Sequence, residues 1–140
     1  MTIEDNTALV RRLFETLNVG MEAVNALRRQ VFAPDEISTF AGRPLDYAAH
    51  AAFDAMLFAA FPDIQYTLED LLAEGDRVVA RFTARGTQTG VFQGIPATGS
   101  TAAVSGIAIY RLAGGKVAEQ WLEYDQLGLL QQLGVIPAMG

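Results

Sequence analysis

The spacing of apolar residues changes from a helical to a strand period at Ile64, and this change limits the fold more than any other feature of the sequence. Before Ile64, apolar residues recur with the period of one helix face. After it, apolar and polar residues alternate, as on a strand with one buried side. Helices followed by strands with short turns form an α+β domain, in which the helices cover one face of a curved, mainly antiparallel sheet.

Three helices are expected before the change. The first carries an apolar stripe and ends at Asn18 to Gly20, and the second stops before Pro34. The third is expected to have Pro44 as its first residue, since proline suits that position. The helices are expected over residues 9–17, from about residue 22, and over residues 44–60. Residues 36–41 fit either a short strand or a loop.

Four antiparallel strands and a short terminal helix are expected after Ile64. Gly75-Asp76 and Gly114-Gly115 read as tight turns, and residues 90–99 form a longer glycine-rich loop. The strands are expected from residue 64 to about 72, then over 77–88, 101–112 and 116–124, with the helix over 127–133. The chain has 140 residues, which is enough for a single domain, residues 1–140, with a buried core.

Composition excludes several classes of function. The chain has no cysteine and one histidine, which removes thiolate sites and disfavours zinc or other metal centres. A net charge of -6 opposes binding to nucleic acid or to anionic membranes. No stretch is apolar enough for a membrane span, and residues 1–5 do not resemble a signal peptide. We therefore expect a soluble cytoplasmic protein without a metal or cofactor.

Asp125 lies where the last strand changes to helical spacing. On an extended strand Trp121 and Asp125 share a face, and a carboxyl group beside a large aromatic ring suits proton chemistry. Glu119 and Glu123 share that face too, so simple patterning would turn all three carboxylates to water unless a polar cavity lies there. Aspartate is also among the best helix N-caps, and a capping role for Asp125 stays open. His50, at the edge of an apolar stripe, is expected to be structural.

Several motifs together resemble one known family. They are A-F-P-D at 60–63, E-D-L-L-A-E-G-D-R-V at 69–78, G-T-Q-T-G with F-Q-G-I-P-A-T-G within 86–99, and W-L-E-Y-D-Q-L-G-L-L-Q-Q-L-G at 121–134. In this order they resemble the SnoaL-like polyketide cyclases, or ester cyclases, of the NTF2-like superfamily. The resemblance implies a cone-shaped NTF2-like barrel with a pocket between helices and sheet.

The resemblance also implies a reaction. It is a cofactor-independent intramolecular aldol condensation of a hydrophobic polyketide-type ester, with Asp125 as general acid/base. Binding energy that holds the two reacting carbons together would supply much of the acceleration. The candidate substrate-binding residues are Trp121, Phe14, Phe53, Met56, Phe82 and Gln88.

Departures from the family pattern keep alternatives open. Gln88 and Gln120 stand where family members often carry histidine, and Phe14 stands where related cyclases tend to have tyrosine. The fold also hosts epoxide hydrolases, isomerases, hydroxylases and non-catalytic binding or dimerisation modules. Tyr47 and Phe58, expected on the outer side of the third helix, suggest contact with a partner subunit. We expect a homodimer or homotetramer.

Overall fold

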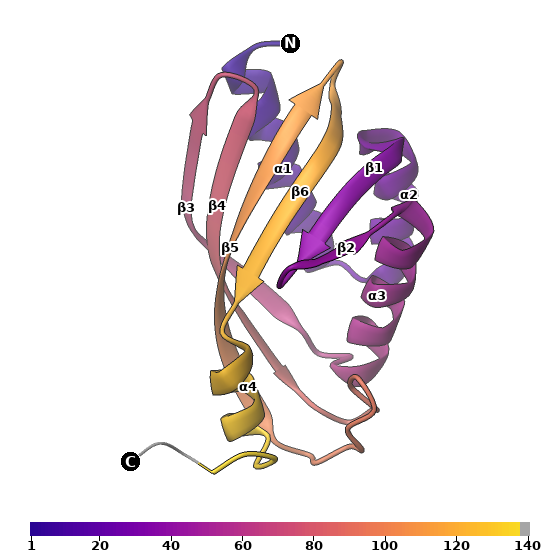
Figure 1. Ribbon diagram of the computed structural model, residues 1–140, viewed down its shortest axis with the longest axis vertical. Coiled ribbons are helices and arrows are strands. Elements are labelled where there is room, and N and C mark those ends of the chain that lie inside the picture. The colour runs from indigo at the N-terminus through magenta and orange to yellow at the C-terminus, as the bar shows by residue number, and fades with distance from the viewer. Residues whose placement is uncertain (138–140) are drawn as a thin grey trace.

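A computed structural model describes residues 1–137 and confirms the α+β class. Figure 1 shows α1 behind β3, β4 and β5, with α2 and α3 beside β1 and β2, and α4 at the end of the molecule opposite the N-terminus. In chain order the elements are α1 (Ile3–Leu17), α2 (Met21–Val31), β1 (Phe32–Phe40), β2 (Arg43–Leu45), α3 (Tyr47–Ala60), β3 (Gln65–Glu74), β4 (Arg77–Thr87), β5 (Thr101–Ala113), β6 (Lys116–Tyr124) and α4 (Gln126–Gln132).

The sheet has six strands in the order β2-β1-β6-β5-β4-β3, two more than the four expected after Ile64. The added strands come from the segment between the second and third helices. β1 runs parallel to β6, with Ser38 opposite Gln120, whereas every other neighbouring pair is antiparallel. β1 begins directly after the last residue of α2, and its pairing with β6 brings Glu36 and Ser38 into the interior.

The start of α3 differs from the prediction. Pro44 lies in β2, at the edge of the sheet, where its missing N–H removes no ladder hydrogen bond. The helix begins at Tyr47 because Asp46 is its N-cap: the Ala49 backbone N–H donates to Asp46 Oδ1 at 2.8 Å. Tyr47 and Phe58, expected on the outer side, instead pack against the core.

Two hydrophobic clusters fill the space between helices and sheet. The first lies beneath α1 and α2 and includes Phe82 of β4; the second surrounds Leu129 of α4 and the 88–100 loop. Phe82 lies over Gly106 of the neighbouring strand, where an added Cβ would come within 2.5 Å of its ring. Any larger residue at Gly106 would therefore push the Phe82 ring out of place. Within residues 1–137, no helix is long and apolar enough to cross a membrane.

Candidate active site

A chain of buried polar groups lies between α2, α3 and β1, within an otherwise hydrophobic interior. His50 and Asp54 are one turn apart on α3 and are only 4% and 9% exposed. They are the helix's only ionisable groups besides Tyr47, and they face inward rather than toward water. Arg28 of α2 and Glu36 of β1 are also buried and lie on either side of them. Buried charges persist in proteins when they are paired, and these four are.

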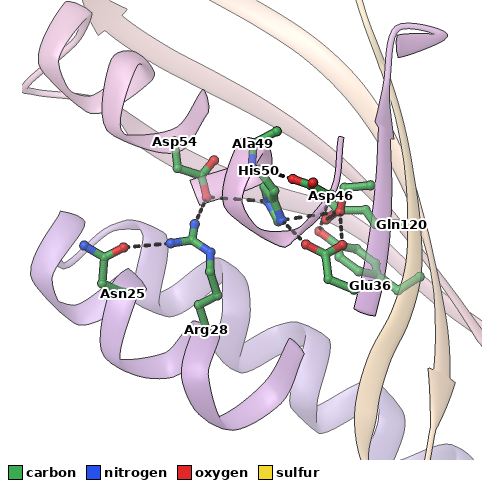
Figure 2. Close-up of polar contacts among 10 residues, drawn as sticks. Asn25, Arg28, Glu36, Asp46, Ala49, His50, Asp54 and Gln120 are labelled. Atoms are coloured by element: carbon green, nitrogen blue, oxygen red, sulfur yellow. Dashed lines mark hydrogen bonds and ion pairs between the residues drawn. The ribbon is translucent and has the colours of Figure 1, made fainter. Parts of the chain in front are cut away.

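The four side chains contact one another in a line, as Figure 2 shows. Arg28 Nη2 donates to Asp54 Oδ2 in a buried ion pair. The same carboxylate oxygen lies 3.5 Å from His50 Nε2. The other ring nitrogen, His50 Nδ1, lies 2.8 Å from Glu36 Oε1. Both contacts to Asp54 use Oδ2, and within residues 1–137 Oδ1 has no hydrogen-bond partner.

Neighbouring polar groups hold the ends of this line. The Ser38 hydroxyl donates to Glu36 Oε2 at 2.7 Å, and Ser38 itself is fully buried. Arg28 Nη1 donates to Asn25 Oδ1 at 2.7 Å, while its buried Nε has no partner within residues 1–137. The phenyl rings of Phe32 and Phe40 meet the His50 imidazole edge-on, with centroids 5.1 and 5.2 Å away. The imidazole is therefore fixed on both its polar and its apolar sides.

The line borders a cavity of about 90 Å³, which we call the first chamber. The polar residues in its wall are Thr16, Arg28, His50, Asp54, Tyr66, Tyr110 and Gln120, and the rest of the wall is aliphatic and aromatic. Gln120 Nε2 donates to the Tyr110 hydroxyl at 3.3 Å. The space exceeds what one water molecule needs, and a minority of polar groups in a largely apolar wall is typical of small-molecule binding sites.

A second chamber of about 80 Å³ adjoins the first. It lies toward α4 and the 88–100 loop, and its wall includes Phe61, Phe92 and Leu129. The residues that line both chambers are Phe53, Leu57, Tyr66, Phe82 and Leu122.

Burial raises the pKa values of three side chains that line the first chamber, those of Asp54, Tyr66 and Tyr110. Removal from water raises the pKa of Asp54, and this outweighs the opposing effects of His50 and Arg28. Burial likewise raises the pKa values of Tyr66 and Tyr110, so both hydroxyls keep their protons. A carboxyl group with a raised pKa can both take and return a proton, while the tyrosine hydroxyls can donate hydrogen bonds to a substrate oxygen.

Three of the sequence-predicted residues line the chambers: Phe14 lines the first, and Phe53 and Phe82 line both. Met56 only packs beside the second core cluster. Trp121 is on the sheet face opposite its strand neighbours Gln120 and Leu122, which line the first chamber, and the Arg77 guanidinium lies 5.1 Å from its ring centroid.

Asp125 and Gln88 line neither chamber. Asp125 is exposed and is the N-cap of α4, accepting a hydrogen bond of 2.9 Å from the Gly128 N–H. Gln88 is fully buried, and its side chain holds the following loop. Its Nε2 donates to the Ile95 and Pro96 carbonyls, and its Oε1 accepts from the Thr98 hydroxyl at 2.7 Å.

The sequence prediction did not include Arg28, Glu36 or Asp54, and it treated His50 as structural. A signal was present: His50 and Asp54 are four residues apart in a helix that carries no other charge, so they share one face. No group of three or more metal-binding side chains occurs within the described residues, 1–137.

Comparison with known proteins settles the family. The sequence profile of the SnoaL-like polyketide cyclases matches residues 8–133. The chain belongs to this family. Among proteins of curated function, none matches the chain at a significant level.

Solved structures of SnoaL-like proteins have the same NTF2-like fold. A candidate SnoaL-like polyketide cyclase from Jannaschia sp. CCS1 is 28% identical, with a TM-score of 0.89 over 98% of this chain and 97% of that one. AclR from Streptomyces galilaeus, a candidate hydroxylase, is 26% identical, with a TM-score of 0.88 over 97% and 100%. IdmH from Streptomyces antibioticus, a candidate polyketide cyclase, is 27% identical, with a TM-score of 0.79 over 92% and 98%.

Proposed function

We propose that this SnoaL-like protein is a cofactor-independent cyclase that closes a ring in a hydrophobic polyketide-type ester by intramolecular aldol condensation. The family supports the reaction class. The observation that carries the proposal is the buried Asp54 carboxyl group, held by Arg28 and His50 at the edge of a largely apolar cavity. A carboxyl group in this position would act as an acid/base on an apolar substrate that is kept from water.

In the proposed reaction Asp54 Oδ1 takes a proton from the carbon next to a substrate carbonyl. The resulting enolate carbon forms a bond to a second carbonyl carbon of the same molecule, and the alkoxide so formed takes the proton back. No atom enters or leaves, so the product is an isomer of the substrate. Arg28 and His50 stabilise the carboxylate through Oδ2, and a Tyr110 or Tyr66 hydroxyl donates a hydrogen bond to the enolate oxygen.

Asp125 is the rival for the acid/base role, because the family resemblance assigns that role to its position. Its exposure and its capping hydrogen bond favour Asp54 instead. The test uses a methyl 3-oxoester with a second ketone placed for six-membered ring closure. Conversion is followed by the change in ultraviolet absorbance, and the mass of the product is expected to equal that of the substrate. We expect Asp54→Asn to lower kcat by about 100-fold or more, and Asp125→Asn to stay within about twofold of wild type.

The opposite pattern, with turnover lost only in Asp125→Asn, would move the acid/base role to Asp125. No ring closure of any such ester by the wild-type protein would reject the cyclase.

A hydroxylase is the second candidate, favoured by the similarity to AclR. It is distinguished by the mass of the product, since hydroxylation adds one oxygen whereas ring closure adds none. Incubation of a phenolic or enolic polyketide under labelled dioxygen would show that oxygen directly. Label in the product would favour the hydroxylase over the cyclase.

A further inference from the structure

The two chambers differ in chemistry although they share a wall. Arg28, His50 and Asp54, three of the four members of the buried line, border the first chamber, and Glu36 lies behind His50. The second is lined by hydrocarbon apart from Tyr66 in the shared wall, Tyr124, Arg85 and the Gly86 backbone. Arg85 is exposed to solvent, so no charged group lies buried around the second chamber. A region of this kind binds hydrocarbon well and has no group that would act on it.

The boundary between the chambers is made of side chains rather than backbone. Phe82 is its central member: its ring lies 5.4 Å from that of Phe14 and 5.5 Å from that of Tyr66. Phe53 of α3 lines both chambers, one residue before Asp54. A molecule whose reactive part lies beside Asp54 would therefore reach the second chamber past these side chains without crossing a strand or helix.

The second chamber is also closed by a fixed part of the chain. Phe92, in the 88–100 loop, is 2% exposed, and its ring meets that of Phe61 edge-on at 5.5 Å. Two backbone N–H groups of the loop, those of Thr89 and Gly90, donate to the Ala60 carbonyl at the end of α3, at 3.0 and 3.2 Å. A cavity whose far wall is tied down in this way is largely pre-formed.

We propose that the second chamber is the binding subsite for an unreactive alkyl or aryl extension of the substrate, whose oxygen-bearing end lies in the first chamber. The proposal rests on the proposed function, since it takes the reactive end to lie beside Asp54. The substrate class is thus narrowed to an amphiphilic ester with its carbonyl groups gathered at one end. A compact molecule with oxygens spread over its whole length would leave polar groups unpaired in the second chamber.

The test measures binding along a homologous series by isothermal titration calorimetry. The probes are the methyl esters of 3-oxobutanoic, 3-oxohexanoic, 3-oxooctanoic and 3-oxodecanoic acid. They lack a second ketone for ring closure, so they report binding apart from turnover. For the wild-type protein we expect Kd to fall by up to about fourfold for each added methylene until the second chamber is full. A Kd independent of tail length would overturn the proposal.

Two substitutions locate the effect. Val104 lines only the second chamber, and Val104→Phe should abolish the gain from the longer tails while leaving Kd for methyl 3-oxobutanoate within about twofold. Val24 lines only the first chamber, so Val24→Phe should weaken every member of the series, the shortest included. If Val104→Phe left the dependence on tail length intact, the subsite would not be the second chamber.

Folding and function are controlled separately. Ala84 also lines only the second chamber, and Ala84→Leu gives a smaller filling change should Val104→Phe not fold, as judged by circular dichroism. Asp54→Asn should keep the dependence on tail length while losing ring closure. Tail-dependent binding in a protein that closes no ring would reject the proposed function and support the subsite. Ring closure together with a Kd that does not depend on tail length would support the proposed function and reject the subsite.

Discussion

Glu36 and His50 form the innermost contact of the site, with Glu36 Oε1 2.8 Å from His50 Nδ1 and the carboxyl group fully buried. An ionised carboxylate only accepts hydrogen bonds, so this contact places a proton on Nδ1. The other nitrogen, Nε2, then faces Asp54 Oδ2 at 3.5 Å. Glu36 thus orients the imidazole without itself lining either chamber.

Substitution Glu36→Gln tests this orientation. The amide can present an N–H group to Nδ1, which favours the wrong tautomer, and it removes the negative charge. We expect kcat to fall by about tenfold or more with KM little changed, because Glu36 acts through His50 and does not line a chamber. Ser38→Ala is the matched control, since it removes one hydrogen bond to Glu36 and keeps the charge. A rise in KM as large as the fall in kcat in Glu36→Gln would contradict a positioning role.

The raised pKa of Asp54 predicts a pH dependence of stability. The folded protein holds this proton more tightly than the unfolded chain, so the contribution of Asp54 to stability is greatest at low pH. It should fall as pH rises from the ordinary aspartate value of about 3.9 through the raised value. The measurement is urea unfolding of wild type and Asp54→Asn at several pH values. Wild type should lose stability relative to the variant by about 1.4 kcal/mol for each unit by which the pKa is raised.

The same group predicts a pH profile for turnover. If ionised Asp54 removes the substrate proton, kcat/KM should rise with pH through a pKa above the ordinary aspartate range. Initial rates over a broad pH range give this acid limb. A limb at or below the ordinary value would argue against Asp54 as the base.

Arg28→Met tests the buried ion pair. The methionine fills much of the same space but leaves Asp54 without the guanidinium that donates to its Oδ2, so we expect a loss of about 3–5 kcal/mol in the free energy of unfolding near neutral pH. The loss should shrink at low pH, where Asp54 is protonated. Because Arg28 lowers the pKa of Asp54 by charge and by hydrogen bonding, the acid limb of kcat/KM should also move to higher pH. Arg29→Met, on the exposed side of α2, is the control.

Asp125 offers a test that separates capping from catalysis. Asparagine is an equally good N-cap, so Asp125→Asn should leave the melting temperature nearly unchanged, whereas Asp125→Ala should cost about 1 kcal/mol. Thermal unfolding measures both. A variant Asp125→Asn that is fully stable but inactive would show that the carboxylate itself is needed, and would favour the role that the family resemblance implies.

We also propose that the protein is a homodimer formed through the outer face of the sheet. Ile107 of β5 is 48% exposed there, and its cross-strand neighbours are Arg81 and Glu123, of opposite charge. Arg81 pairs with Asp70 of its own chain at 2.6 Å. In a dimer with a two-fold axis, Glu123 of one copy would approach this pair in the other copy, around the apolar centre. Light scattering should give twice the monomer mass for wild type and the monomer mass for Ile107→Lys. A monomeric wild type would reject the proposal.

The sequence was sufficient to predict the elements with the clearest periods. The alternation after Ile64 gave four strands, and the stripe at residues 9–17 gave α1. For β1 it left residues 36–41 open between strand and loop and missed the start at Phe32, because Phe32–Phe40 follows α2 without a turn. The parallel pairing of β1 with β6 joins residues about 80 positions apart, as Ser38 and Gln120 show. Only tertiary contact decides such a pairing.

The site was harder to predict for the same reason. Its members come from α2, β1, α3 and β6, so no single stretch of sequence contains the cluster. Asp125 was predicted as the acid/base because it lies where strand spacing changes to helical spacing. A helix N-cap lies at the same kind of position. Asp54 lies among alanines and other apolar residues, and a single aspartate in such a segment gives by itself no pattern that indicates a site.

Gln88 has a consequence for how members of such a family can diverge. One buried amide fastens both the middle and the far end of the 88–100 loop, through Ile95, Pro96 and Thr98, while the strands on either side continue their ladder from Thr87 and Thr101. The segment between these anchors can therefore change its length and sequence without disturbing the strand pairing. New binding properties could then arise by exchange of this one segment, while the buried line from Arg28 to Glu36 stays unchanged.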